Sequence, residues 1–205
     1  MDLIVETLPD GTSRLVWPGG AARCALGRGH IRADKREGDG ATPVGAFTLR
    51  RVLYRPDRLE APATGLPVAP IAPRDGWCDD PAHPDYNRPV IRPFAASHEE
   101  LWREDPVYDV IVILGHNDDP PVPGLGSAVF LHVAKPDFEP TAGCVALQLP
   151  DLLAVLRDCR PGDRLMVPMP PSASAPPARE GGTDAGDPAH HGHGVHAAGL
   201  GPGRA

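Results

Sequence analysis

The sequence predicts a mainly β fold with two or three short helices, an α+β arrangement in which mixed sheets pack as a sandwich. Short runs of alternating or β-branched apolar residues recur between turn residues along most of the chain. Proline (27) and glycine (23) make up close to a quarter of the 205 residues, which suits a turn-rich and strand-rich protein. We expect one domain over residues 1–168, since only these residues offer enough apolar side chains for a core.

The first predicted strands follow one another closely. The runs LIVETL (3–8), RLVWP (14–18) and ARCALG (22–27) are separated by proline- and glycine-bearing turns, and AFTLRRVLY (46–54) comes later. This order is typical of a β-meander. The segment 27–45 is rich in glycine and charge, so we expect an exposed loop there.

The middle of the chain combines a long loop, a helix and a strand. Residues 56–94 are dense in proline and lack periodicity, which predicts a functional loop held to the body by its aromatic side chains. SHEELWRED (97–105) carries a capping box, Ser97 with Glu100, and predicts a short helix. VYDVIVILGHN (107–117) is apolar and β-branched, and predicts a central strand.

The C-terminal part contains two strands, a helix and a last strand. SAVFLHV (127–133) and CVALQL (144–149) have strand composition and are joined by a proline-bearing loop. PDLLAVLRDC (150–159) predicts a helix with proline in its first turn, and RLMVP (164–168) predicts a strand. Residues 169–205 form a Pro/Gly/His-rich segment with almost nothing to bury, which indicates a disordered tail.

Composition excludes several classes of function. The net charge of −7 and the pI near 5.7 argue against nucleic-acid or anionic-membrane partners, which require a basic face. No apolar stretch is long enough for a signal-peptide core or a membrane span. The four cysteines form no CxxC pair, so neither a zinc ribbon nor a disulfide framework is indicated, and at least one is a candidate for a free, working thiol.

His132 and Cys144 are the candidate catalytic pair. A thiol attacks a carbonyl as thiolate, so a catalytic cysteine needs a base nearby. The strand-loop-strand pattern of residues 130–147 brings His132 next to Cys144, and Gly143 allows the backbone to approach a substrate and its amides to stabilise an oxyanion. An inert buried pair fits the same spacing. A zinc site using His116, His132 and Cys144 is a further alternative, for which no fourth ligand is evident.

Several segments resemble the catalytic core of the L,D-transpeptidases of the YkuD type. Those enzymes carry a histidine on one strand and then a Ser/Thr-x-Gly-Cys segment, as in GSAVFLHVAKPDFEPTAGCVAL (126–147). The resemblance includes residues 27–49, with the T-P-x-G-x-F element, GWCDDPAHPDYN (76–87), SHEELWRED, VYDVIVILGHND and PGDRLMV. It implies an L,D-transpeptidase-like β-sandwich of mixed sheets. This chain has Ala142 where better-known members have histidine, and Ala146 where they have a basic residue.

The resemblance implies a peptidoglycan L,D-transpeptidase. Such an enzyme attacks the bond between the diamino acid and D-alanine of a stem tetrapeptide, forms an acyl-enzyme and passes the acyl group to an amine. An L,D-carboxypeptidase that uses water, or a non-catalytic peptidoglycan-binding module, are alternatives. The expected partners are peptidoglycan stem peptides and carbapenem-type inhibitors, no cofactor or metal is expected, and the expected location is the periplasm or cell envelope, although no signal peptide is visible.

The resemblance also assigns roles to individual residues of the catalytic segment. Cys144 is the expected nucleophile and His132 its general base. The backbone amides of Gly143 and Cys144 are expected to stabilise the oxyanion, and the carbonyl of Val133 to orient the histidine ring. Thr141 and Ala142 are expected to contact the substrate.

Three further residues are expected to bind substrate, each with a plainer alternative. Tyr86 and Asn87 either face the substrate or hold the long loop in place. Arg32, together with Lys35 and Arg36, either meets the carboxylates of the stem peptide or is simply solvated.

Overall fold

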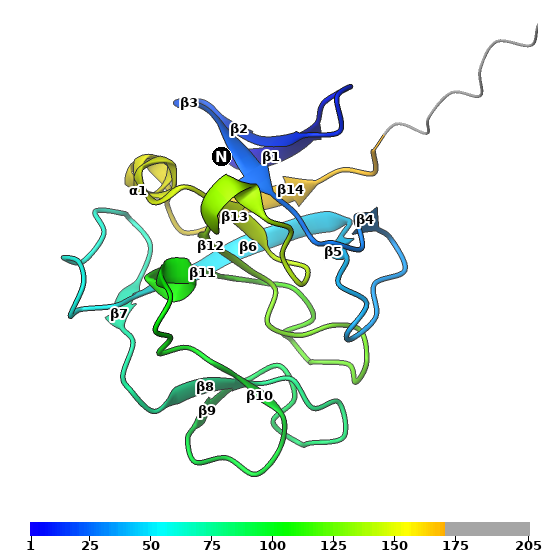
Figure 1. The fold of residues 1–205 in the computed structure, drawn as a ribbon, viewed down its shortest axis with the longest axis vertical. Helices are drawn as coiled ribbons and strands as arrows, with labels where there is room; N and C mark the ends of the chain where they lie inside the picture. The colour runs from blue at the N-terminus through cyan, green and yellow to red at the C-terminus, as the bar shows by residue number, and fades with distance from the viewer. Residues whose placement is uncertain (171–205) are drawn as a thin grey trace, which may run out of the picture. The chain divides into compact units, whose positions relative to one another are not determined.

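The computed structural model describes residues 1–170 and contains one large sheet, two small sheets and one α-helix (Figure 1). The strands of the large sheet are β1 (Asp2–Thr7), β2 (Ser13–Trp17), β3 (Gly20–Ala25), β6 (Gly45–Tyr54), β7 (Val68–Pro70), β11 (Val110–Leu114), β12 (Phe130–Val133), β13 (Val145–Leu147) and β14 (Arg164–Val167). The small sheets contain β8 (Asp75–Cys78), β9 (Pro89–Ile91) and β10 (His98–Glu100), and β4 (Ile31–Arg32) and β5 (Thr42–Pro43). The α-helix is α1 (Leu149–Asp158), and two 3₁₀ turns are η1 (Pro106–Tyr108) and η2 (Pro136–Phe138).

The large sheet closes on itself, which differs from the predicted sandwich. Its strands run in the order β11-β12-β13-β3-β2-β1-β14-β6-β7, and β6 also pairs with β11. This last pairing joins the two ends of the series into a barrel-like ring, with β7 outside it. The sheet is mixed, since β1–β14, β12–β13 and β6–β7 are parallel pairs. The mainly β, α+β class is therefore confirmed, whereas two stacked sheets are replaced by one closed sheet.

Most of the predicted strands are confirmed. The antiparallel pairs β1–β2 and β2–β3 form the predicted meander. The last strand β14 and the helix α1 occupy the predicted segments. Leu152, Val155 and Leu156 are the buried residues of α1, at the i, i+3 and i+4 spacing of a helix that covers a core with one face. This helix is too short and too polar to cross a membrane, and no other α-helix occurs within residues 1–170.

The prediction of a helix over 97–105 is wrong. His98–Glu100 form β10, which pairs antiparallel with β8, with Glu99 opposite Trp77. The backbone amide of Leu101 then donates to the carbonyl of Asp75 at 3.1 Å. These hydrogen bonds to distant residues pair the backbone N–H and C=O groups that a helix would have paired locally. Tertiary pairing therefore outweighs the local helix signal. Within residues 1–170, one α-helix is present where two or three were predicted.

The predicted loops contain more structure than expected. The proline-rich segment 56–94 contributes β7, β8 and β9. Its aromatic residues Trp77 and Tyr86 are buried, at 6% and 2% exposure, which supports the expectation that they hold the segment to the body. The charged segment 27–45 is only partly exposed, because Lys35 and Thr42 are buried.

The central strand β11 is buried on both faces. Val110, Val112 and Leu114 belong to one hydrophobic cluster, whereas Ile111 and Ile113 belong to a second. Burying each such side chain stabilises the fold by about 1.5–3 kcal/mol. Burial of both faces also explains why this segment is apolar at every position and does not alternate.

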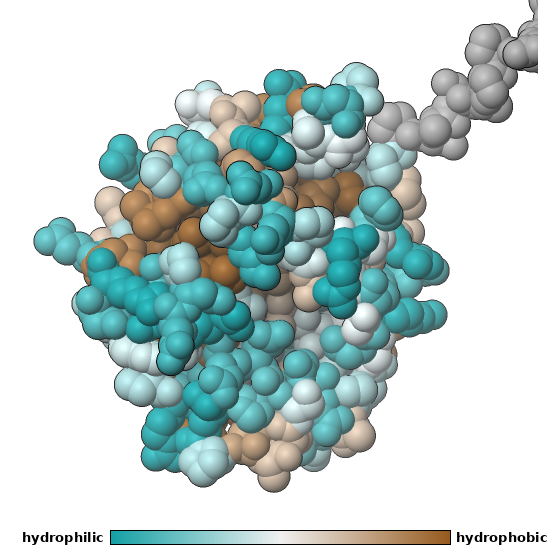
Figure 2. Space-filling model, viewed as in Figure 1, coloured by the Kyte–Doolittle hydropathy of each residue, from teal (hydrophilic) through white to brown (hydrophobic). Residues whose placement is uncertain are grey.

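The neighbouring strand β12 brings the candidate base to the second cluster. Side chains alternate along a strand. Leu131 and Val133 lie in the first cluster with α1, so Phe130 and His132 face the side of the second cluster, which also contains Cys144. The face of the molecule shown in Figure 2 is mostly hydrophilic, with an apolar area between the positions at which Figure 1 draws α1 and β7.

Candidate active site

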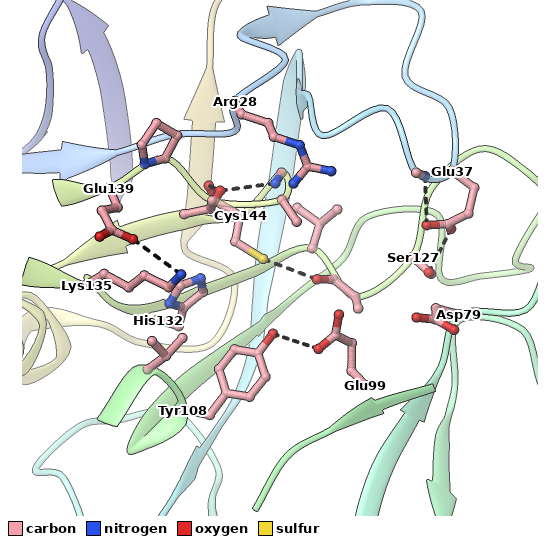
Figure 3. Close-up of a pocket in the computed structure, with 18 of the residues that line it drawn as sticks. Arg28, Glu37, Asp79, Glu99, Tyr108, Ser127, His132, Lys135, Glu139 and Cys144 are labelled. Atoms are coloured by element: carbon pink, nitrogen blue, oxygen red, sulfur yellow. Dashed lines mark hydrogen bonds and ion pairs between the residues drawn. The ribbon is translucent and has the colours of Figure 1, made fainter. Parts of the chain in front are cut away.

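His132 and Cys144 line the same cavity, which has a volume of about 380 Å³ and is here named the Cys144 cavity. In Figure 3 the sulfur and the imidazole ring both project into it. Its walls come from separate parts of the chain: residues of the 28–38 segment, Asp79 after β8, Glu99 in β10, Tyr108 in η1, and the 139–144 segment. The predicted pair is thus brought together by the closed sheet.

Cys144 lies directly before β13 and is held as a neutral thiol. It is 7% exposed, and its sulfur accepts a hydrogen bond from the Phe130 amide and donates one to the Ala128 carbonyl, each at 3.3 Å. Burial raises the pKa of the Cys144 thiol to about 12, and the nearby Glu99 adds to this rise. The Phe130 hydrogen bond and the charge of Lys35 lower the pKa of the thiol but do not overcome burial.

His132 is a neutral imidazole with a defined tautomer. Its Nδ1 lies 2.9 Å from the carbonyl oxygen of Val133. A carbonyl can only accept, so Nδ1 carries the proton and Nε2 is left with the lone pair of a base. Burial lowers the pKa of His132 to about 4, against the smaller opposing effect of the Val133 hydrogen bond. The Tyr108 ring packs edge-on against the imidazole, with centroids 5.4 Å apart, and restricts its rotation.

The segment before Cys144 is tied down by Thr141. Its hydroxyl donates to the Cys144 carbonyl at 2.7 Å and accepts from the Gly143 amide at 3.1 Å. Its own amide donates to the Leu26 carbonyl at 2.9 Å. Thr141, Ala142 and Gly143 all line the Cys144 cavity, so the three positions predicted from the resemblance lie beside the thiol.

Position 143 accommodates glycine but no residue with a Cβ atom. Its φ is +138°, and a Cβ there would lie 2.8 Å from the backbone oxygen of Ala41. We expect Gly143→Ala to lower the free energy of unfolding by about 2–4 kcal/mol. The strain of a positive φ in alanine adds to the clash between its Cβ and the Ala41 backbone. Gly11 has φ +83° and nothing within 4 Å, so Gly11→Ala isolates the strain. Urea denaturation of both variants measures the difference, and equal losses would contradict the proposed clash.

Tyr86 and Asn87 lie behind the cavity and do not line it. The Tyr86 hydroxyl donates to Glu37 at 2.5 Å. The Asn87 side-chain oxygen accepts from the Trp77 indole at 2.9 Å and from the Ala128 amide at 3.1 Å. Since the Ala128 carbonyl accepts from the Cys144 thiol, Asn87 supports the segment that orients the sulfur. Holding structure in place is therefore the role that the contacts of both residues support.

Arg32 and His116 lie outside the Cys144 cavity. The guanidinium of Arg32 is exposed and forms a bidentate ion pair with Asp34, at 3.0 and 2.9 Å. The ring of His116 packs edge-on against Phe47 and is not part of the cavity lining. Among residues 1–170 no group of three or more His, Cys, Asp or Glu side chains is arranged to hold a metal ion. The alternative of zinc bound by His116, His132 and Cys144 is therefore without geometric support. The predicted tail, including its histidines, lies outside the described residues.

A group of acidic residues in the cavity was not predicted. Glu37, Asp79 and Glu99 gather on one side of the cavity in Figure 3, opposite His132 and Lys135. Burial, followed by the nearby charge of Asp79, raises the pKa of Glu99. The Tyr108 hydroxyl donates to this carboxyl at 3.4 Å. The repeated acidic residues of the segments 79–80 and 99–100 were visible in the sequence, but the predicted helix over 97–105 gave no reason to place Glu99 beside Asp79.

The position of Ala146 explains one difference from better-known members of the family that the sequence resembles. Ala146 is fully buried in β13, opposite Ala25 on β3 and beside His132 on β12. It packs in a small cluster with Ala25 and Ala134. Because Ala146 is fully buried, a long basic side chain at this position would overpack this cluster.

Comparison with known proteins identifies the family. A model described as YkuD, L,D-transpeptidase catalytic domain, matches residues 4–169. Searches of curated proteins and of solved structures found no significant match. The matched segment spans the closed sheet except the first two residues of β1, and it includes every residue that lines the Cys144 cavity. The chain therefore belongs to the YkuD family of L,D-transpeptidase catalytic domains.

Proposed function

We propose that this chain is a cysteine-dependent acyltransferase that acts on the stem peptides of peptidoglycan. One observation carries the proposal: Cys144 and His132 line one cavity, and the hydrogen bond from Nδ1 to Val133 leaves Nε2 as the basic nitrogen. Membership of the L,D-transpeptidase family supports the substrate class. The bond attacked is the one between the diamino acid and the terminal D-alanine of a stem tetrapeptide.

In the first step the thiol is activated as it attacks. Because burial favours the neutral forms of both Cys144 and His132, a resting thiolate–imidazolium pair is disfavoured. The S–H turns from the Ala128 carbonyl toward Nε2 of His132, which takes the proton while sulfur bonds to the carbonyl carbon. The resulting oxyanion accepts hydrogen bonds from backbone amides at Cys144 and Gly143. The Gly143 amide must leave the Thr141 hydroxyl to do so.

Collapse of this intermediate breaks the C–N bond. His132 gives its proton to the departing amine, so D-alanine leaves neutral at that nitrogen and a thioester remains on Cys144. An amine from a second stem peptide then attacks the thioester, passes a proton to His132, and releases the thiol as the new amide forms. Water in place of the amine gives L,D-carboxypeptidase activity. Because the substrate is a cell-wall polymer, we infer that the protein acts in the periplasm or cell envelope.

The test is intact-mass measurement of the protein during incubation with a stem tetrapeptide. We expect a mass gain equal to the tripeptidyl group, together with one D-alanine released per protein. Adding an amine acceptor should discharge the protein and yield the crosslinked peptide. Discharge at the same rate without acceptor would assign a carboxypeptidase. Peptide binding with no D-alanine release would instead assign a non-catalytic binding module and overturn the proposed reaction.

A further inference from the structure

Lys35 is a buried cation in the wall of the Cys144 cavity. Its side chain is 8% exposed, although lysine is rarely buried without a specific partner. It lines the cavity together with Gly143 and Cys144. A Cβ built on Gly143 would lie 3.8 Å from the Lys35 Nζ, which places the ammonium next to the residue that precedes the nucleophile.

The other three cations of the 28–38 segment are placed differently. Arg32 and Arg36 are exposed and do not line the Cys144 cavity, whereas Arg28 lines the cavity but is exposed to solvent. Of the three basic residues for which contact with substrate carboxylates was considered, Lys35 alone is positioned to make one. The exposed Lys135 at the cavity margin has its own carboxylate partner, Glu139, at 3.5 Å.

The ammonium of Lys35 retains one hydrogen-bond donor. A protonated lysine has three N–H groups. Within residues 1–170, one bonds to the Arg36 carbonyl at 2.8 Å and one to the carboxylate of Asp39. The Asp39 carboxylate also accepts from the backbone amides of Arg36 and Ala41, each at 2.8 Å. Asp39 therefore divides its charge among three donors, and the third N–H of Lys35 is available to a ligand in the cavity.

The proposed substrate carries a negative charge at a matching distance from the reacting carbonyl. The terminal carboxylate of a stem tetrapeptide belongs to the residue that leaves. Its carbon is three bonds from the carbonyl that Cys144 attacks, a separation of at most about 4 Å. A group that recognises this carboxylate must therefore lie close to Cys144. Lys35 meets this requirement, because its Nζ lies beside Gly143 in the wall of the same cavity.

We propose that Lys35 binds the terminal carboxylate of the donor stem peptide and so selects peptides that end one residue beyond the scissile bond. This inference rests on the proposed function. In the partly desolvated cavity a charge-assisted hydrogen bond is strong and poorly screened by salt. An exposed cation such as Lys135 is screened by solvent and contributes little to the same discrimination.

The experiment compares two donors, a stem tetrapeptide ending in D-alanine and the same peptide ending in D-alaninamide. For the parent protein we expect kcat/KM for acylation to be about 10- to 100-fold higher with the free carboxylate. Lys35→Met should remove this preference by slowing only the carboxylate donor. Lys135→Met, which removes a positive charge from the cavity margin, should keep the preference. Circular dichroism and melting temperatures establish whether the variants are folded.

The outcomes separate this inference from the proposed function. If the parent is acylated by both donors at similar rates, the carboxylate is not recognised and the inference is overturned without any variant. If Lys35→Met slows both donors equally, Lys35 acts on structure or on the oxyanion and the inference is equally overturned. If neither donor acylates the parent, the proposed function itself fails.

Discussion

Cys144→Ala is expected to abolish covalent reaction with a carbapenem. Such an inhibitor contains a strained cyclic amide. A nucleophilic thiol attacks its carbonyl carbon and opens the ring, which leaves a stable acyl-enzyme. Incubating the parent protein should increase its intact mass by that of one inhibitor molecule. Removing the sulfur removes the only group in the Cys144 cavity that can form this thioester, so the variant should show no mass gain.

Cys159→Ala provides the matched control. Cys159 is also a free, fully buried thiol whose pKa is raised by burial to about 12. It lies at the end of α1 and donates to the Val155 carbonyl at 3.3 Å, outside the Cys144 cavity. The two cysteines thus share their burial and the shift of their pKa but not their access to a base. A mass gain that persists in Cys144→Ala, or disappears in Cys159→Ala, would show that the nucleophile is assigned to the wrong residue.

The proximity of His132 and Cys144, the proposed catalytic pair, was predictable because it depends on two strands joined by a short loop. Strand composition placed His132 on one strand and Cys144 at the start of the next, and the structure has His132 in β12 and Cys144 directly before β13. The helix α1 was predictable for the same reason, since its proline position and apolar spacing lie within ten residues. Local patterns of this kind require no knowledge of distant partners.

The closed sheet could not be predicted from local patterns. Closure depends on the pairing of β6 with β11, whose strands are separated by the whole proline-rich segment, and on the parallel pairing of the first and last strands. The same limit explains the error at residues 97–105. A capping box is a local preference worth about 1 kcal/mol, and the pairing of β10 with β8 supplies several non-local hydrogen bonds in its place.

The positions of Lys35 and Glu37 in the cavity wall could likewise not be predicted from local sequence patterns. Lys35 and Glu37 lie in a glycine-rich charged segment that looks solvated in the sequence. The Glu37 carboxylate accepts from Tyr86 at 2.5 Å and from Ser127 at 2.7 Å, across sequence separations of 49 and 90 residues. The half-buried position of Glu37 is specified by partners far along the chain, so charge patterning alone predicts a solvated loop.

His132→Gln is expected to slow acylation of Cys144 about 10²- to 10⁴-fold, the usual contribution of a general base. Glutamine can still donate to the Val133 carbonyl but offers no basic nitrogen to the thiol. Because burial lowers the pKa of His132 to about 4, the parent should keep its acylation rate from pH 7 down to pH 5. A rate that already falls at pH 6.5 would indicate a solvated base and contradict the buried geometry.

Folding stability provides an independent measurement on the same variant. In the unfolded chain His132 takes up a proton below pH 6.5, whereas the folded protein does so only near pH 4. Between these values the unfolded state binds more protons, so the free energy of unfolding decreases as the pH falls, by roughly 3 kcal/mol in total. His132→Gln lacks this loss. Urea denaturation at pH 7 and pH 4.5 should therefore show the parent losing more stability than the variant, and equal losses would mean that His132 is not held neutral beside Cys144.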